Sequence, residues 1–325
     1  MHIMKNLVAE GKSILFITHK LNEIKAAADR CTVLRKGKSV GTVDVASTSI
    51  DELSEMMVGR KVNFSVEKVE KEPGEIILKV ENLTVKSKTH GKALVDNANF
   101  IVRSGEIVCI AGIDGNGQRE LVYALAGLIE PDEGHIYLEG RELKQAKEKT
   151  KVSHIPEDRH RHGLVLDFNL AYNLVLQSYF FPRFQKKGFL NYNEIYRYAD
   201  SLINRFDIRS GSGARTVARS MSGGNQQKAI VAREIDRDSR LLIAVQPTRG
   251  LDVGAIEYIH QQLVAERSKG KGVLLVSLEL DEVMDVSDRI LVIYEGSIVA
   301  DVRPKNVTYQ ELGLYMSGSK KRESA

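Results

Sequence analysis

A glycine-rich segment, GIDGNGQRE at residues 112–120, has the residue types and spacing to bind an anion. It follows the apolar run EIVCIA, which we expect to be a strand, and it opens a helix expected over about residues 118–128. Glycines let the backbone amides of such a turn point inward at a helix N-terminus, where they bind phosphate. The segment therefore has the frame of a phosphate loop, G-x-x-x-x-G-K-[ST].

Two side chains that normally contact the phosphates are replaced in this loop. Gln118 stands at the lysine position, and Arg119 stands at the position of the hydroxyl that binds Mg²⁺. Losing the lysine removes a charge-assisted contact worth about 1.5–3 kcal/mol, which Arg119 could replace in part. Taken alone, the loop is equally compatible with a structural turn. The expected nucleotide contacts are Gly112, Gly115, Asn116, Gly117, Gln118, Arg119 and Glu120.

Further motifs follow the loop in a specific order. The run SGGNQQ begins at Ser222 and opens a helix expected at residues 224–236, and LLIAVQPTRGLD follows at residues 241–252. Together with the loop, these motifs resemble those of an ATP-binding cassette. The segments IPEDRHRHGL and QPTRGLDVGA resemble the second cassette of the tandem-cassette ATPase subunits of bacterial simple-sugar and nucleoside importers.

The resemblance implies a fold and a set of site residues. The fold would be an α/β, ABC-type P-loop NTPase cassette, with a mixed sheet core plus a helical subdomain, preceded by the C-terminal fragment of another cassette. Two cassettes of the family pair head to tail, so that each ATP lies between one P-loop and the other cassette's signature. The signature would be Ser222, Gly223, Gly224, Asn225 and Gln226, and the D-loop residue would be Asp252.

The sequence departs from the family pattern at the positions that act on water and metal. Val245 and Gln246 stand where the Walker-B strand has Asp for Mg²⁺ and Glu as general base. Leu278 replaces the switch histidine, and Glu157 replaces the Q-loop glutamine. Losing a general base costs roughly 10²–10⁴ in rate. We therefore expect this cassette's own P-loop to be degenerate, with weak or absent nucleotide binding and no hydrolysis.

An internal repeat indicates a second copy of part of the cassette. Residues 11–59 align without gaps with residues 270–318, at an offset of 259 positions. The repeat keeps Gly11-Lys12, Asp29-Arg30 and Gly37 of the first copy, and it keeps the apolar class between them. In this register His19 aligns with Leu278, so the first copy retains the switch histidine. The chain is thus expected to be a fragment of a roughly 500-residue protein.

The repeat and the composition set the expected domains. Residues 1–60 would be the C-terminal fragment of a first cassette and residues 61–74, with charged KVEKEPG, a linker. Residues 75–318 would be the complete second cassette, with a helical subdomain at about 167–236, and residues 319–325 a tail. His19 and the signature would then act on one ATP, with Mg²⁺, held by the first cassette's P-loop in the full-length protein.

This resemblance implies partners and a location. The expected function is the ATP-binding subunit of an importer for a nucleoside or a simple sugar, peripheral on the cytoplasmic face of the membrane. It would bind integral permease subunits and act indirectly with an extracytoplasmic solute-binding protein, while the fragment alone is expected to be inactive. Two alternatives stay open: a soluble tandem cassette of the translation or DNA-repair type, and a non-catalytic binding module.

Composition agrees with a globular cassette and excludes other classes. Hydrophobic residues make up 42%, and no apolar run approaches the roughly 20 residues of a membrane span. The net charge of +4, with both signs interspersed, does not indicate nucleic acid binding. Cys31 and Cys109 lie in apolar runs typical of buried, reduced thiols.

Two other clusters have a structural explanation. His154, His160 and His162 lie near acidic residues, but their spacing matches no metal motif, so we predict a solvated loop and no metal site. The aromatic run at residues 179–198 is expected to be partly helical core. Some of its aromatics, Phe181 and Phe184 among them, could face a permease subunit.

Overall fold

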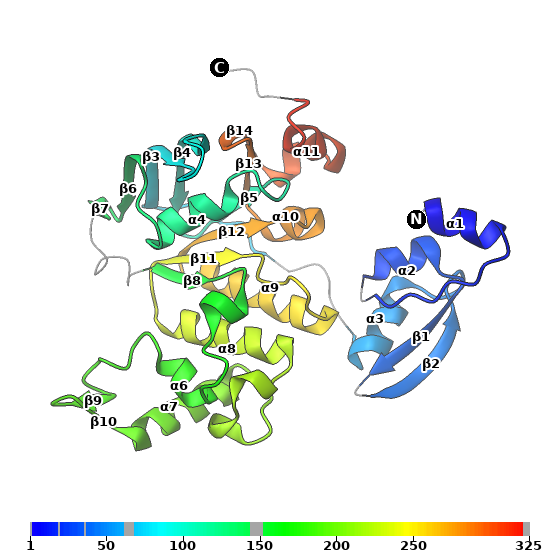
Figure 1. Ribbon diagram of the computed structural model, residues 1–325, viewed down its shortest axis with the longest axis horizontal. Coiled ribbons are helices and arrows are strands. Elements are labelled where there is room, and N and C mark those ends of the chain that lie inside the picture. The colour runs from blue at the N-terminus through cyan, green and yellow to red at the C-terminus, as the bar shows by residue number, and fades with distance from the viewer. Residues whose placement is uncertain (1, 19, 36, 62–67, 144–151, 321–325) are drawn as a thin grey trace. The chain divides into compact units, whose positions relative to one another are not determined.

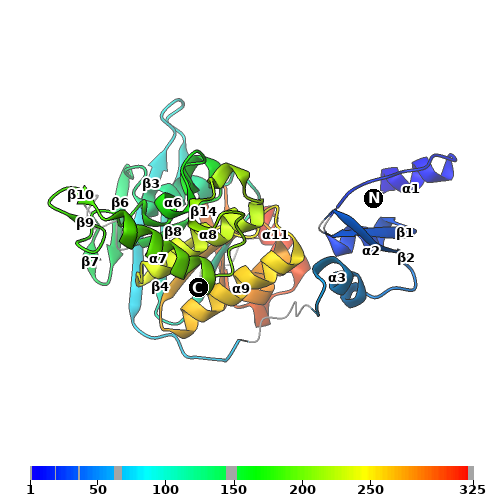
Figure 2. The same cartoon turned by 90° about the horizontal axis from the view of Figure 1, so that it is seen from below.

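The computed structural model describes residues 2–18, 20–35, 37–61, 68–143 and 152–320. The chain divides into two compact units (Figures 1 and 2). The larger unit contains residues 66–249 and 259–325, and the smaller contains residues 1–65 together with 250–258.

A six-stranded mixed sheet forms the centre of the larger unit. Its order is β14-β13-β5-β12-β11-β8, and every neighbouring pair is parallel except β13 with β14. The strands are β5 (Ile107–Ala111), β8 (Val152–Ile155), β11 (Leu241–Val245), β12 (Gly272–Ser277), β13 (Arg289–Tyr294) and β14 (Ser297–Val302). Strands β5, β11 and β12 are buried along their whole length, as expected for central strands covered on both faces.

A second, antiparallel sheet of four strands, in the order β4-β3-β6-β7, packs beside the first. It consists of β3 (Ile76–Lys86), β4 (Ala93–Arg103), β6 (Glu133–Leu138) and β7 (Arg141–Glu142). Side chains from both sheets form one core with helix α4 (Gln118–Ala126).

Helices cover the central sheet and extend beyond it. Figure 1 shows α6, α7 and α8 grouped below β8 and β11, on the side away from the four-stranded sheet. The unit's other α-helices and short strands are α6 (Leu170–Val175), a hairpin of β9 (Gln185–Lys186) and β10 (Phe189–Leu190), α7 (Tyr192–Arg205), α8 (Gly223–Asp236), α9 (Val253–Ser268), α10 (Leu280–Val286) and α11 (Tyr309–Met316); the first residues of α9, 253–258, are assigned to the smaller unit.

The smaller unit has a short helical and hairpin structure of its own. Its elements are α1 (His2–Ala9), α2 (Leu21–Ala27), β1 (Arg30–Arg35), β2 (Lys38–Asp44) and α3 (Ile50–Val58). Ile24, Val33 and Leu53 are central in its apolar core. In contrast, Leu15 and Ile17 are almost fully exposed, at 96% and 97%.

The elements of the two units correspond at the 259-residue offset. Helices α2 and α10 start and end at matching positions, and so do strands β1 and β13. The β1–β2 hairpin has a register shift between Val33 and Leu34, and β13–β14 has one at the equivalent pair, Val292 and Ile293. Helix α3 begins with a Ser49–Glu52 capping box, and α11 begins with a matching box at Thr308 and Glu311. The two segments therefore match in the polarity of their side chains and also in the positions of their helix caps and strand register shifts.

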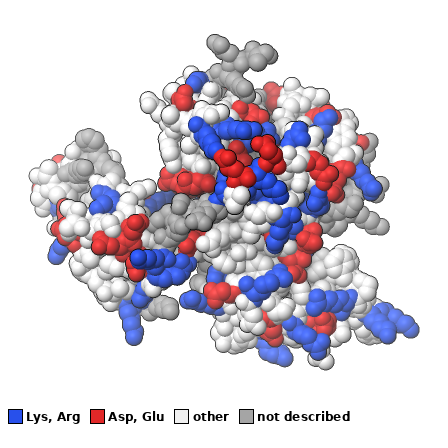
Figure 3. All heavy atoms as spheres, turned by 180° about the vertical axis from the view of Figure 1, so that it is seen from behind, with Lys and Arg blue, Asp and Glu red and all other residues white. Residues whose placement is uncertain are grey.

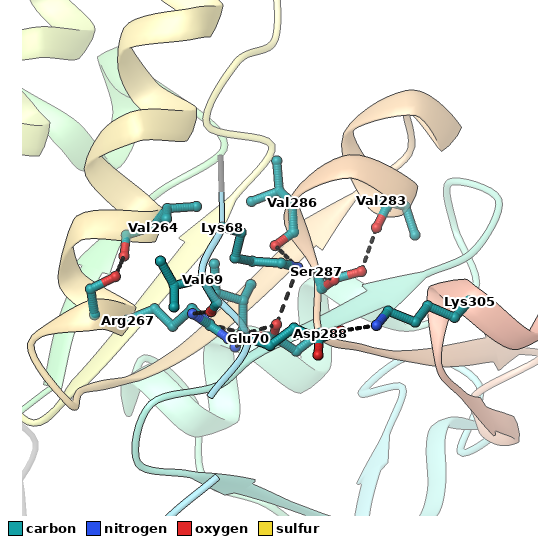
Figure 4. Close-up of polar contacts among 12 residues, drawn as sticks. Lys68, Val69, Glu70, Val264, Arg267, Val283, Val286, Ser287, Asp288 and Lys305 are labelled. Carbon is teal, nitrogen blue, oxygen red and sulfur yellow. Dashed lines mark hydrogen bonds and ion pairs between the residues drawn. The ribbon is translucent and has the colours of Figure 1, made fainter. Parts of the chain in front are cut away.

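The segment that precedes β3 is fixed to the larger unit by polar contacts (Figure 4). Lys68 Nζ donates to the carbonyl oxygens of Val286 and Ser287 at 3.1 and 2.6 Å, at the C-terminal end of α10. It also pairs with Asp288, whose carboxylate accepts from Arg267 at 2.7 Å. Cations at a helix C-terminus are stabilising. Residues 62–67 of the expected linker lie outside the described residues.

Charged side chains of both signs lie side by side on the face drawn in Figure 3. This agrees with the mixed charge pattern of the sequence and its modest net charge of +4. The cysteines differ in environment: Cys109 on β5 is fully buried and Cys31 on β1 is half-buried, and burial raises the pKa of both thiols.

One half-buried histidine, whose ring Nε2 is enclosed by the protein, should make stability depend on pH. Burial lowers the pKa of the His154 imidazole on β8 from its usual 6.5 to about 4. Between these values the unfolded chain binds a proton that the folded chain does not, so the free energy of unfolding should decrease as the pH falls, by at most about 1.4 kcal/mol per pH unit. In urea unfolding from pH 7.5 to 4.5, the free energy of unfolding of wild type should therefore fall relative to that of His154→Leu, by up to this slope.

The matched control is His90→Leu, because His90 is exposed in a turn. This control should keep the wild-type pH dependence. A constant difference between wild type and His154→Leu across the pH range would contradict the prediction.

Candidate functional site

The glycine-rich loop connects strand β5 to helix α4, as the sequence predicts. Gly115 and Gly117 have positive φ angles of 92° and 97°, a backbone region that favours glycine. A Cβ at Gly117 would overlap the carbonyl oxygen of Leu94, and one at Gly112 would lie 2.7 Å from that of Ile293. Close packing therefore requires glycine at 112 and 117. A positive φ angle favours glycine at 115 and 117.

The Gln118 carboxamide is folded into the loop from which it projects. Its Oε1 accepts the Asn116 backbone N–H at 3.0 Å, and its Nε2 donates to the carbonyl oxygen of Ile113 at 2.9 Å. The residue is only 6% exposed. The Asn116 side chain makes two further hydrogen bonds. It donates to the carbonyl oxygen of Ile113, within the loop, and accepts the Glu295 N–H at 2.7 Å. The loop thus satisfies several of its polar groups internally.

An ion-pair chain lies next to the loop. Glu157, which follows β8, contacts Arg249 at 2.5 Å and Arg119 at 3.7 Å. The glutamate is mostly buried and both arginines are about half-exposed, with side-chain exposures of 20%, 61% and 55%. The chain joins the start of α4, the Q-loop position and the turn after β11. Sequence reasoning did not predict that the substitutions at 119 and 157 would form a pair.

The positions expected to act on metal and water lie at the ends of adjacent strands. Val245 is the last residue of β11 and is buried. Gln246 follows with a φ angle of 43°, and its N–H donates to Val276 of β12 at 2.7 Å. Leu278 follows β12 directly and is half-buried. None of the three side chains is a carboxylate, so they cannot supply the metal ligand or general base that the family pattern has there.

The signature residues lie at the N-terminus of α8. Ser222 is exposed and its hydroxyl accepts from Asn225 at 2.9 Å, while Gly223 and Gly224 are half-buried. Gln226 is buried, and its Nε2 donates to the carbonyl of Ala218 at 2.9 Å. The arrangement presents a hydroxyl and glycine backbone at a helix N-terminus, where the helix dipole favours an anion.

The structure does not test the roles of two further predicted residues. Asp252 accepts the Ala255 N–H at 2.9 Å at the start of α9, within the smaller unit. His19, the expected switch histidine, lies outside the described residues. Both roles stay predictions.

The three loop histidines have separate surroundings. His160 Nε2 lies 3.0 Å from Gln226 Oε1, and His162 stacks edge-on against Tyr123 with ring centroids 5.6 Å apart. His154 on β8 is half-buried, with its Nε2 enclosed by the protein. In the part of the chain that the structure describes, no group of three or more His, Cys, Asp or Glu side chains is arranged to bind a metal ion.

A buried polar cluster that the sequence did not indicate links three elements near the site. Glu282 of α10 accepts from Thr248 Oγ1 at 2.9 Å, and His260 Nε2 of α9 lies 2.9 Å from the same carboxylate oxygen. All three side chains are buried. The cluster joins the turn after Gln246 to the helix that follows Leu278. Its members are distant in sequence, so only the fold reveals it.

The aromatic run divides between core and surface. Phe184 is 3% exposed and packs against Tyr198 with ring centroids 5.0 Å apart, so the hypothesis that it faces a partner was wrong. Phe181 and Phe189 are exposed, at 49% and 81%. Lys187 and Gly188, both with positive φ, form the two-residue turn of the β9–β10 hairpin near them.

These observations define a class of protein. Residues 95–249 match the family model described as ABC transporter. A solved ATP-binding subunit of an ABC transporter matches the fold with a TM-score of 0.62 at 20% identity, covering 74% of this chain and 99% of that one. The chain therefore has the α/β ABC ATPase cassette fold with a helical subdomain, as predicted, while the preceding fragment of another cassette stays a prediction.

The chain also matches curated proteins named for nucleoside and sugar import. The chain is 52% identical over 322 residues to the nucleoside import ATP-binding protein NupA of Lactococcus lactis, covering 98% of this chain and 63% of that protein. It is 52% identical over 328 residues to the guanosine import ATP-binding protein NupO of Bacillus subtilis, covering 100% and 64%. It is 43% identical to the glucose import ATP-binding protein TsgD13 of Haloferax volcanii, covering 97% and 58%.

The chain carries an ABC transporter ATP-binding cassette of the type found in sugar and nucleoside importers. It spans about three fifths of the length of the relatives that it matches. Among the described residues, no helix has the length and apolar character needed to cross a lipid bilayer.

The buried Thr248–His260–Glu282 cluster should contribute to stability. Replacing Glu282 by Ala removes the acceptor that Thr248 and His260 share, and leaving buried polar groups unsatisfied costs about 1–3 kcal/mol. Urea unfolding at pH 7.5 should show a loss of that size, with a smaller loss in Glu282→Gln, which keeps an acceptor oxygen.

Asp200→Ala, at an exposed position on α7, serves as the control. It should change the free energy of unfolding by no more than about 0.5 kcal/mol. A Glu282→Ala variant as stable as wild type would show that the cluster is not stabilising.

Proposed function

We propose that this chain is part of the ATP-binding subunit of an importer that takes up a nucleoside or a simple sugar. The observation that carries this proposal is the coincidence of the cassette fold with 52% identity to two proteins named for nucleoside and guanosine import. The subunit would lie on the cytoplasmic face of the membrane, bound to permease subunits, and would act indirectly with an extracytoplasmic solute-binding protein.

The domain arrangement is a tandem one. Residues 1–60 are the closing part of a first cassette, 61–74 the linker, 75–318 the second cassette and 319–325 the tail. The matching bounds of α2 and α10, the equivalent register shifts in the two hairpins and the paired capping boxes support this assignment. The exposed apolar side chains of Leu15 and Ile17 support it too, because they align with the buried strand β12, where Leu274 and Val276 are covered by neighbours.

Hydrolysis would take place at a composite site. ATP and Mg²⁺ would bind the P-loop of the first cassette, and the signature residues Ser222 and Gly224 would contact the phosphates from the second. His19 and Asp252 would complete the site. The exposure of Ser222 at the N-terminus of α8 supports this role, because its hydroxyl is accessible to a ligand held by another body.

The second cassette's own P-loop would not support hydrolysis. Val245, Gln246 and Leu278 lack the groups that bind Mg²⁺, activate water and sense the γ-phosphate in the family pattern. Arg119 is paired with Glu157 at 3.7 Å and is therefore engaged within the protein. We assign this P-loop a structural or regulatory role between the two cassettes.

Variants of the signature and of the degenerate Walker-B position should separate the two sites. In the full-length parent assembled with its permease, Gly224→Asp places a carboxylate beside the ATP phosphates and should lower the ATP hydrolysis rate by about 10²-fold or more. Gln246→Ala should change the rate by less than about twofold. Steady-state phosphate release at saturating Mg·ATP measures both.

Co-purification of the permease with Gly224→Asp provides the control for assembly. An equal loss in the two variants would mean that the second P-loop contributes to turnover. Failure of the wild-type subunit to purify with any membrane subunit would instead favour the soluble tandem-cassette alternative.

The solute class can be tested through stimulation of the ATPase. Reconstituted with permease and solute-binding protein, the full-length parent should hydrolyse ATP faster on addition of guanosine or another nucleoside than on addition of ribose, xylose or glucose. We expect nucleoside because the two relatives at 52% identity carry nucleoside names, whereas the relative named for glucose import is 43% identical. Stimulation by a monosaccharide alone would assign the protein to sugar import.

A further inference from the structure

Gln118 does not merely lack the charge of a lysine, because its side chain also bonds to backbone groups of the phosphate loop. Its carboxamide forms a hydrogen bond at each end, one to the Asn116 N–H at 3.0 Å and one to the Ile113 carbonyl at 2.9 Å. The side chain is 6% exposed and lies inside the turn that the glycines create. A loop amide that would otherwise be available to a phosphate oxygen is therefore already bonded to the protein.

Glutamine can do this and lysine cannot. A lysine side chain has three donors and no acceptor, so it could donate to the Ile113 carbonyl but could not accept the Asn116 N–H. A carboxamide has both a donor and an acceptor, with the spacing to join a backbone N–H to a backbone C=O. The replacement at 118 thus adds a neutral group that mimics one phosphate oxygen toward the Asn116 amide.

The charged side chains next to the loop are also paired within the protein. Glu157 contacts both Arg119 and Arg249, so the carboxylate and the two guanidinium groups form a chain within the protein. An incoming polyphosphate would have to compete with Glu157 for these cations, and it would bring a like charge close to that carboxylate. Both the loop amide and the neighbouring cations are therefore engaged.

We infer that Gln118 is an internal occupant of the phosphate loop, which keeps phosphate out of this cassette's P-loop by bonding the Asn116 amide. This inference rests on the proposed function, in which the loop is degenerate, and adds a cause to it. The side chain excludes phosphate as well as failing to attract it. Consequently, shortening the side chain should improve phosphate binding, although it supplies no new charge.

The test is calorimetric titration of the whole 325-residue chain with sodium pyrophosphate and, separately, with ATP, with and without Mg²⁺. Wild type should show no saturable binding at millimolar ligand. Gln118→Ala should show saturable pyrophosphate binding, with a Kd at least about tenfold below the highest concentration at which wild type shows none, a difference of about 1.4 kcal/mol or more. Gln118→Lys should bind more tightly again, because it frees the same amide and adds a cation.

Gln185→Ala is the matched control. Gln185 also joins its own backbone through both ends of its carboxamide, since it donates to the Phe180 carbonyl and accepts the Gly188 N–H, each at 3.1 Å. It belongs to the β9–β10 hairpin rather than to the phosphate loop. Its removal should leave pyrophosphate binding at the wild-type level.

The possible results separate this inference from the proposed function. If Gln118→Lys gains affinity and Gln118→Ala does not, the loop lacks only charge and the inference is overturned, while the degenerate site stands. If wild type itself binds Mg·ATP tightly, the proposed degeneracy fails, and the inference fails with it.

A second measurement covers the case in which Gln118→Ala does not fold. Amide hydrogen exchange at Asn116 should be slow in wild type and clearly faster in Gln118→Lys, because only glutamine accepts that N–H. Equal exchange rates in the two proteins would overturn the inference without reference to binding.

Discussion

The parallel pairing of β5, β12 and β11 is the constraint on which the site depends. Parallel strands leave a sheet at the same edge, and the register pairs Ala111 with Ser277 and Val245 with Val276. The glycine loop, Leu278 and Gln246 must therefore lie close together, although they are distant in sequence. Any change in one of these loops affects the surroundings of the other two.

The polar side chains of the site bond to one another and to the backbone within the protein. Each unusual side chain finds a partner nearby: Gln118 bonds its own loop, and Glu157 joins Arg119 to Arg249. Unpaired buried charges and polar atoms are costly, so each of these side chains needs a partner within the protein. Thr248, His260 and Glu282 are paired in the same way, but all three side chains are buried.

Much of the fold follows from local sequence signals. Helix α11 runs from Tyr309 to Met316 because signals readable in the sequence delimit it, a Thr308–Glu311 capping box at its start and Gly318 after its end. Motif spacing also places Gln118, Gln246 and Ser222 correctly at the ends of their elements. The partners of Gln118 and Glu157 could not be predicted, because they depend on side-chain rotamers and on contacts made across the sheet. Phe184 was misjudged because an aromatic run does not reveal which rings face the core.

The equivalent register shifts in the two hairpins limit how a repeated unit can change. A bulge fixes which face each following side chain points to, and moving it by one residue would turn that whole set over. Both hairpins keep the shift at the same place, between Val33 and Leu34 and between Val292 and Ile293. Side chains at equivalent positions can therefore differ one at a time, as His19 and Leu278 do, whereas one residue inserted into a paired strand would turn the side chains beyond it to the opposite face.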